Sequence, residues 1–137
     1  MAPSRELIFG HSVVLWTEEQ LNLRFEKAAG IGVALDGRLV AGVVYSEYRP
    51  NVPAIEASIA ATDPAWASRQ VLRAIFAYPF NQLGVVRLSA TTAKSNKPAR
   101  EFLVRLGFQL EGIGRRAFPG GGDAAVYSML KAECSWL

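Results

Sequence analysis

The stretch Ser95–Phe108, SNKPAREFLVRLGF, contains one helix together with both of its boundaries. Asn96 is a natural N-cap, because its side-chain oxygen can accept a hydrogen bond from a free amide of the first turn. Apolar side chains recur behind it at helical spacing, at Ala99, Phe102, Leu103 and Leu106. Gly107 suits the left-handed conformation in which many helices end, and Phe108 opens the next apolar run. The stretch therefore predicts an amphipathic helix between two strands.

Alternating apolar residues predict strands on both sides of this helix. They cover Glu6–Phe9, Ile31–Leu35, Leu39–Tyr48, Ala54–Ala61, Val85–Thr91, Phe108–Ala117 and Ala124–Leu130. The dipeptide Asp36-Gly37 is a strong signal for a tight hairpin between the second and third of these strands. The sequence therefore predicts a sheet that begins with a hairpin and ends with a second pair of neighbouring strands.

Two more helices are expected ahead of the Asn96 helix. Residues 11–22 alternate apolar and polar positions in a way that favours a helix. The second helix begins behind Asp63 or behind Ser68, both of which are good N-caps, and Pro79 should kink or end it. Residues 131–137 are expected to form a short turn that packs Trp136 against the rest of the protein.

This order of elements predicts an α+β fold. Its β-helix-β units add local parallel pairing to a mixed, mainly antiparallel sheet with flanking helices. With 137 residues, half of them apolar, the chain suits one domain, residues 1–137, with a substantial core.

The composition argues against several classes of protein. The formal net charge of +3 comes from basic residues spread along the chain without an aromatic-basic cluster, which argues against a nucleic-acid partner. One cysteine and one histidine argue against a metal site. No window approaches 18 uncharged apolar residues, and no signal segment is evident. We therefore expect a cytoplasmic protein with no membrane partner.

The order strand, Asn, helix, Gly-Phe, strand resembles the C-terminal half of the GCN5-related N-acetyltransferases, whose last helix often reads N-x-x-A-x-x-x-Y-x-x-x-G-F. Asn96, Ala99, Gly107 and Phe108 match this pattern, and Leu103 stands at the tyrosine position. The strings YPF (78–80), RLGF (105–108), EG (111–112) and VYSML (126–130) are similar to small bacterial and phage-encoded members. The resemblance covers about residues 30–130. It implies the acyl-CoA N-acyltransferase fold, in which a parallel strand pair splays apart.

The resemblance implies acetyl-CoA as a cosubstrate and no metal. In the family, the loop before the central helix reads Q/R-x-x-G-x-G/A, and its amides receive the pyrophosphate, as a helix N-terminus attracts an anion. Here that loop falls on residues 63–68, with Asp63, Trp66 and Ser68 at the three defined positions. The cofactor-binding candidates are Ile59, Ala60, Trp66, Ala67, Ser68, Arg69, Asn96, Lys97 and Arg100. The alternatives are a capped core helix with Trp66 packed inward, and cations on a solvated helix face.

Acetyl transfer to an amine needs a base and hydrogen-bond donors for the oxyanion. Glu56 is the only ionisable residue of its predicted strand, and related enzymes often keep a glutamate there, so it is the candidate base, directly or through a water. Backbone amides near Ile59 or Ala60 are the candidate oxyanion donors. Because Leu103 replaces the tyrosine, the alternative acids come from other elements: Tyr45, Tyr48, Tyr78 and Tyr127. Tyr127 is the best placed of them if its strand borders the slot. The alternative interpretation of Glu56 is an exposed residue on a strand edge.

The sequence thus indicates an acetyl-CoA-dependent N-acetyltransferase that acts on a primary amine of a small molecule or peptide. The rival interpretation is a non-catalytic acetyltransferase-like module that binds a protein or a nucleic acid, since the loop and the tyrosine position both depart from the family. The identity of the acceptor and the oligomeric state, a homodimer included, stay open at this point.

Overall fold

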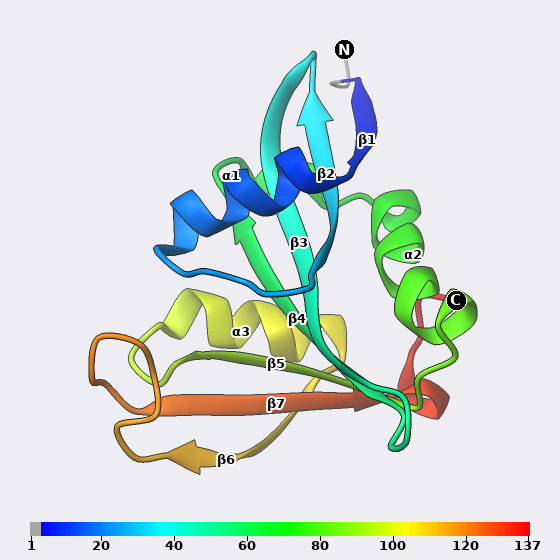
Figure 1. Ribbon diagram of the computed structural model, residues 1–137. Coiled ribbons are helices and arrows are strands. Elements are labelled where there is room, and N and C mark those ends of the chain that lie inside the picture. The colour runs from blue at the N-terminus through cyan, green and yellow to red at the C-terminus, as the bar shows by residue number, and fades with distance from the viewer. Residues whose placement is uncertain (1–3) are drawn as a thin grey trace.

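The computed structural model describes residues 4–137, which fold into a seven-stranded sheet flanked by helices (Figure 1). The strands are β1 (Arg5–Phe9), β2 (Ala29–Leu35), β3 (Arg38–Arg49), β4 (Ala54–Ala61), β5 (Arg87–Ala93), β6 (Gln109–Gly114) and β7 (Ala124–Leu130). They lie in the order β1-β2-β3-β4-β5-β7-β6, and within the described residues only the β4–β5 pair is parallel. The predicted α+β fold with a mixed, mainly antiparallel sheet is confirmed.

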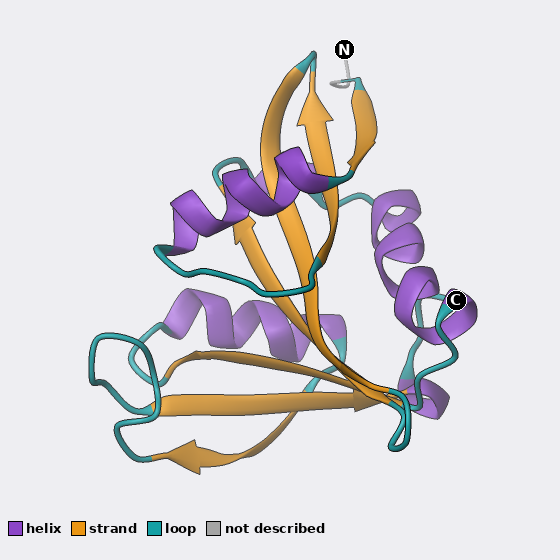
Figure 2. Ribbon diagram, in the orientation of Figure 1, coloured by secondary structure: helices purple, strands orange, loops and turns teal. Residues whose placement is uncertain are grey.

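Within the same residues, three α-helices connect the strands (Figure 2): α1 (His11–Leu21), α2 (Arg69–Ala77) and α3 (Lys97–Leu106). Shorter helical turns cover Pro64–Trp66, Tyr78–Gln82 and Lys131–Glu133. None of the helices in residues 4–137 has both the length and the apolar composition needed to span a membrane.

The helix predicted behind Asn96 is α3. Asn96 Oδ1 accepts a hydrogen bond from the Ala99 amide at 3.2 Å, and Gly107 follows the helix with a φ of 109°. Leu103 and Leu106, from the predicted apolar stripe, are buried. Both boundaries could be predicted because each depends on a local hydrogen bond or a local backbone conformation.

Both N-cap predictions ahead of α2 are confirmed, because two helical segments follow one another. The Asp63 carboxylate accepts a hydrogen bond from the Ala65 amide at 2.9 Å and caps the turn Pro64–Trp66. The Ser68 hydroxyl accepts one from the third amide of α2 at 3.2 Å. As predicted, α2 ends just ahead of Pro79, and the chain continues in a wider helical turn that contains this proline.

Several strand boundaries differ from the prediction by one to three residues, and two of these differences have a visible cause. β6 ends at Gly114, three residues earlier than expected, because the Asp123 carboxylate accepts a hydrogen bond from the Arg116 amide at 2.9 Å. β5 begins two residues later than expected, because the Val85 amide donates to the Pro79 carbonyl at 3.0 Å. Both differences come from hydrogen bonds outside the strands, which apolar alternation does not report.

The helices lie on opposite faces of the sheet. Gly42 of β3 faces α1 so closely that a Cβ there would overlap the hydroxyl of Thr17, which is buried in α1. Gly32 of β2 faces α1 in the same way. Ile31 and Val43 are the sequence neighbours of these two glycines, so they point to the opposite face of the sheet, where they form a core with α2 and α3. α1 packs against β1, β2, β3 and β4, as Figure 1 shows.

Phe76 of α2 lies at the centre of the core. Its ring centroid is 6.1–6.4 Å from those of Phe80, Phe108 and Trp136. The Trp136 indole N–H also donates a hydrogen bond to the Leu106 carbonyl at 2.8 Å. The predicted packing of the C-terminal turn is therefore confirmed, and one aromatic cluster joins α2, the end of α3 and the C-terminus.

Candidate active site

The parallel strands β4 and β5 separate soon after they meet. Their pairing includes only Ala54 with Arg87, Ile55 with Leu88, and Glu56 with Ser89. Beyond these pairs β4 continues beside β3 while β5 continues beside β7, so the two strands diverge (Figure 1). Alternate amides and carbonyls of residues 57–61 therefore lack a strand partner on the β5 side. The splayed parallel pair implied by the family resemblance is confirmed.

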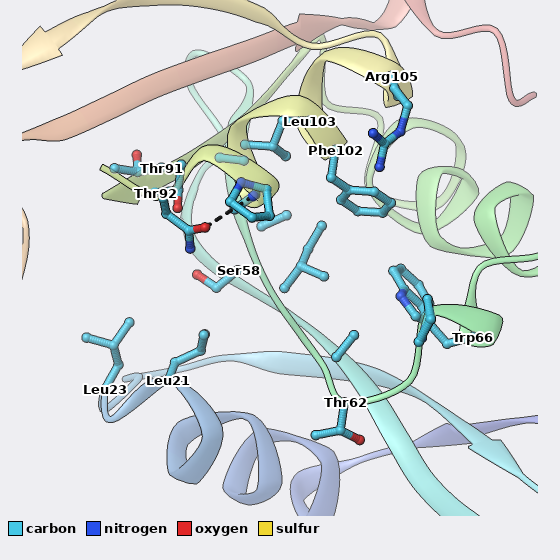
Figure 3. Close-up of a pocket in the computed structure, with 18 of the residues that line it drawn as sticks. Leu21, Leu23, Ser58, Thr62, Trp66, Thr91, Thr92, Phe102, Leu103 and Arg105 are labelled. Atoms are coloured by element: carbon cyan, nitrogen blue, oxygen red, sulfur yellow. Dashed lines mark hydrogen bonds between the residues drawn. The ribbon is translucent and has the colours of Figure 1, made fainter. Parts of the chain in front are cut away.

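A cleft of about 570 Å³ lies where the strands separate (Figure 3). Its lining comes from β4, β5, α3, the loop after β4 and the end of α1, and includes Ser58, Thr91, Asn96, Phe102, Leu103, Trp66, Leu21 and Leu23. Phe102 and Leu103 belong to α3 on one face of the sheet, whereas Leu21 ends α1 on the other face. The cleft therefore passes through the sheet and joins its two faces.

The cleft has one apolar wall and several hydroxyl groups. Trp66 is only 3% exposed, and its ring centroid is 5.9 Å from that of Phe102. Ser58, Thr91 and Thr92 lie across the cleft from this pair in Figure 3. The site can therefore hold an elongated, partly apolar molecule and form hydrogen bonds along one side of it.

Charge is sparse in the cleft. Among the described residues that line it, only Asp63 and Arg105 are charged. The Arg105 guanidinium lies 5.9 Å from the centroid of the Phe102 ring, and the Asp63 carboxylate already holds the Ala65 amide. Within residues 4–137, no three His, Cys, Asp or Glu side chains form a group that could hold a metal ion.

Glu56 lies at the last position where β4 pairs with β5, just outside the cleft. It is exposed, as the alternative interpretation predicted, but β4 lies between β3 and β5 and is not an edge strand. Glu56 points to the same face as Ser58, about 7 Å further along the strand. Partial burial raises the pKa of the Glu56 carboxyl, and the Glu47 carboxylate raises it further, while Arg49 and Arg87 oppose the shift. Glu56 therefore lies beside the cleft without lining it.

The loop predicted to bind pyrophosphate uses several of its amides internally. The Trp66 amide donates to the Asp63 carbonyl at 3.3 Å, and the Ser68 amide donates to the Trp66 carbonyl at 3.2 Å. The Ser68 hydroxyl is occupied as the cap of α2. The amides of Ala67 and Arg69 have no such backbone hydrogen bond among the described residues. Only some of the amides of the predicted loop are therefore free to bind an anion.

The side chains of this loop also differ from the prediction. Trp66 borders the cleft but packs inward, as the alternative interpretation stated, and Ala67, Ser68 and Arg69 do not line the cleft. The exposed Arg69 guanidinium lies 5.5 Å from the centroid of the Trp136 ring. A cation–π contact of this kind orients the guanidinium and leaves its outer edge free.

The candidates on α3 divide between two sides of that helix. Asn96 lines the cleft, where its side chain also caps the helix. Lys97 and Arg100 line a second, more open groove of about 690 Å³ together with Lys94. The predicted α3 residues therefore do not converge on one point.

Tyr127 lines the second groove and not the cleft. It is 2% exposed, and its hydroxyl accepts a hydrogen bond from Arg100 Nε at 2.9 Å. β7 thus directs this side chain under α3, so the condition on which Tyr127 was a candidate acid, that its strand borders the slot, is not met. Leu103, at the family's tyrosine position, does border the cleft.

The predicted oxyanion region lies in the part of β4 that has left β5. Ile59 lines the cleft, and Ala60 is buried beside it. Ala57 and Ser58, which the sequence placed in the cleft beside Glu56, do line it. Leu21 and Leu23 were not predicted, because their place depends on how the end of α1 approaches β4, and no local pattern reports that.

The structure is similar to solved acetyltransferases. A GCN5-related N-acetyltransferase from Brucella melitensis is 26% identical over 76% of this chain and 51% of its own, with a TM-score of 0.64. A GNAT-family acetyltransferase from Bacillus anthracis is 23% identical over 76% of this chain and 67% of its own, with a TM-score of 0.62. Mutant forms of the spermidine/spermine N-acetyltransferase SpeG from Vibrio cholerae are 15% identical over 94% of this chain and 96% of their own, with a TM-score of 0.75.

No family model matches the sequence, and no curated protein matches it. The chain spans 62% and 64% of the length of two further solved structures, each with a TM-score of 0.69. These similarities, together with the splayed β4–β5 pair, confirm the resemblance at the level of the fold. The chain has the fold of the GCN5-related N-acetyltransferases.

Proposed function

We propose that the protein transfers the acetyl group of acetyl-CoA to a primary amine. The observation that supports this most strongly is the cleft between β4 and β5, which is lined from both faces of the sheet. A transfer reaction must bring two substrates together in a fixed orientation, and a passage with two mouths lets each enter from its own side. We place acetyl-CoA on the side of α2 and α3, and the amine on the side of α1.

The residues that would hold acetyl-CoA lie along α2, α3 and the loop after β4. The pantetheine arm would lie beside Trp66 and Asn96 in the cleft. Its pyrophosphate would accept hydrogen bonds from the free amides of Ala67 and Arg69 at the start of α2, where the helix dipole also attracts an anion. Ser68 contributes its backbone only, because its hydroxyl caps the helix.

Positive charge for the phosphates would come from more than one element. Arg69 lies at the start of α2, while Lys97 and Arg100 lie on the outer side of α3. The two cations of α3 line the more open groove and not the cleft, so they would attract the phosphates over a longer range and with stronger dependence on salt.

The acetyl group would react where β4 leaves β5. Glu56 takes a proton from the substrate ammonium, directly or through a water, and the amine nitrogen then attacks the thioester carbon. Backbone amides near Ile59 and Ala60 stabilise the oxyanion, because this part of β4 has left its parallel neighbour. The carbon–sulfur bond then breaks. A thiol pKa near about 8.5 allows water to protonate the thiolate, so Leu103 does not prevent turnover.

The activity is tested by free-thiol release from acetyl-CoA in the presence of primary amines. We expect thiol release above the amine-free rate, together with one acetylated amine per thiol. Acetyl-CoA binding without any amine-dependent release would favour the rival function, a non-catalytic binding module. The inward packing of Trp66 and the leucine at position 103 are the observations that favour that rival.

Arg69→Glu should weaken acetyl-CoA binding by about tenfold, roughly 1.4 kcal/mol, because it reverses the charge next to the pyrophosphate. Arg69 is exposed, so the free energy of unfolding should change by less than about 0.5 kcal/mol. Calorimetric titration with acetyl-CoA measures the first effect and urea denaturation the second.

Arg73→Glu is the matched control, since it makes the same charge change on the exposed side of α2, one turn further from the proposed pyrophosphate. Equal losses of affinity in the two variants would indicate a general charge effect. An unchanged affinity for Arg69→Glu would move the pyrophosphate away from α2.

A further inference from the structure

A row of polar residues crosses the sheet beside the cleft, on the face against which α1 packs. Strand pairing aligns Ser46 of β3 with Glu56, Glu56 with Ser89 of β5, and Ser89 with Ser128 of β7. Residues paired in this way point to the same face of the sheet. Glu56 lies two residues from Ser58, which lines the cleft. The row is therefore continuous with the side of the cleft where we place the amine.

The serines of this row are buried, yet their hydroxyls are not all used. Ser46, Ser89 and Ser128 are 6%, 7% and 7% exposed. No fully buried side-chain oxygen in residues 4–137 lacks a hydrogen-bond partner, and the hydroxyls of Ser46 and Ser89 are in none of the side-chain hydrogen bonds of these residues. These two hydroxyls therefore keep some contact with solvent. A hydroxyl can both donate and accept, so the row can bind an ammonium or a carboxylate.

Glu56, Glu47 and Arg49 are unpaired charges at or beside this row. Arg49 aligns with Ala54 and Ala54 with Arg87, so both arginines lie on the same face as Glu56, one row further along the strands. Arg87 is occupied, since it donates two hydrogen bonds to the Glu111 carboxylate at 2.6 and 2.7 Å. Three ion pairs occur within residues 4–137, and neither Glu56 nor Arg49 takes part in them. A free carboxylate and a free guanidinium thus lie on one face.

We propose that the acceptor is a free amino acid, whose ammonium binds at Glu56 and the serine row and whose carboxylate pairs with Arg49. Glu56 and the backbone position of Arg49 are roughly 7 Å apart along the strands, so their long side chains can converge on one zwitterion. A guanidinium binds a carboxylate through two parallel hydrogen bonds, which fixes the orientation of the amine as well as its position. This inference rests on the proposed function and names its acceptor class.

A polyamine is the acceptor against which the proposal is tested. Spermidine and spermine, which give SpeG its name, carry several cations along one chain. Two of these cations would find the Glu56 and Glu47 carboxylates, but a polyamine has no carboxylate for Arg49, and a cation placed beside Arg49 is repelled.

Matched amines test the proposal most sharply. Each pair consists of an amino acid and the amine that remains when its carboxylate is removed: serine with ethanolamine, leucine with isoamylamine, and phenylalanine with phenethylamine, with spermidine added as a polyamine. Amine-dependent thiol release from acetyl-CoA is measured for each. We expect kcat/KM for the preferred amino acid to exceed that of its matched amine by at least about tenfold, as expected for one charge-assisted contact.

Arg49→Gln tests whether a preference for amino acids comes from the contact between Arg49 and the substrate carboxylate. At a pH high enough to keep Glu56 ionised in both proteins, it should raise KM for the amino acid by about tenfold with kcat nearly unchanged, and should leave kcat/KM of the matched amine unaltered. Arg38→Gln, at the other exposed end of β3, makes the same charge change and should leave both substrates unaltered.

The outcomes distinguish this inference from the proposed function. Transfer to spermidine or to the matched amines at rates equal to the amino acids would overturn the inference while supporting acetyl transfer. An amino-acid preference that survives Arg49→Gln would have the same meaning. Acetyl-CoA binding with no transfer to any amino acid would also overturn the inference. A protein that neither binds acetyl-CoA nor releases its thiol would overturn both.

Discussion

Glu56→Gln is expected to lower kcat by about 10²- to 10⁴-fold while acetyl-CoA still binds, because the amide cannot take a proton from the amine. Glu56 lies at the point where β4 and β5 separate, two residues from the lining of the cleft, and is the ionisable residue of β4. The same substitution keeps the size and hydrogen-bonding capacity of the side chain, so the fold should be preserved. Single-turnover measurements at saturating acetyl-CoA test the prediction.

The dependence of kcat on pH gives a second test of Glu56 as the base. Glu56 works as a base only when it is ionised, so activity should fall as pH decreases through its pKa. Because partial burial and the Glu47 carboxylate raise that pKa, the fall should occur at higher pH than for an ordinary carboxyl group. Glu56→Gln should remove this limb of the profile.

Glu47→Gln is the matched control for the pH profile. It removes a charge that raises the pKa of Glu56, so the acidic limb should move to lower pH while the maximal kcat is kept. If Glu56→Gln retained full kcat from pH 6 to 9, Glu56 would not be the base, and orientation of the substrates would be the main source of catalysis.

Phe76→Ala is expected to destabilise the protein by about 3–5 kcal/mol, the usual cost of removing a large ring from a packed core. Phe76 is 2% exposed, and its ring packs among Phe80, Phe108 and Trp136. The loss should be large because these residues come from different parts of the chain and cannot all move inward to fill the cavity. Urea denaturation with linear extrapolation measures the change.

Val104→Ala serves as the control for this substitution. Val104 is 58% exposed on α3, so its truncation should change the free energy of unfolding by less than about 0.5 kcal/mol. A loss below about 1 kcal/mol for Phe76→Ala would show that the aromatic cluster does not join α2 to the rest of the core.

Most of the fold could be predicted because its signals are local. Asn96 and Gly107 define the ends of α3 through a cap and a left-handed residue, and Asp36-Gly37 defines a hairpin. The alternation of apolar residues predicted both ends of β4 and of β7 correctly. Alternation did not predict burial along all of β4, since Ala61 is exposed where the strand has left β5.

The candidate site was harder to predict because it depends on contacts between distant segments. Leu21 and Leu23 line the cleft because α1 ends beside β4. Tyr127 lies under α3, on a strand that β5 separates from β4, and its hydroxyl accepts a hydrogen bond from Arg100. The internal hydrogen bonds of the loop at Trp66 likewise come from an extra helical turn. Residue identity could name these candidates but not the direction in which each points.

Binding of acetyl-CoA to the unmodified protein is the most direct test of the account. Its central claim is that the cleft between β4 and β5 holds acetyl-CoA, so a ligand at about 100 times its dissociation constant should stabilise the folded protein by roughly 2.7 kcal/mol. We predict that the unfolding midpoint rises with acetyl-CoA concentration. An unchanged midpoint at millimolar acetyl-CoA would contradict the account.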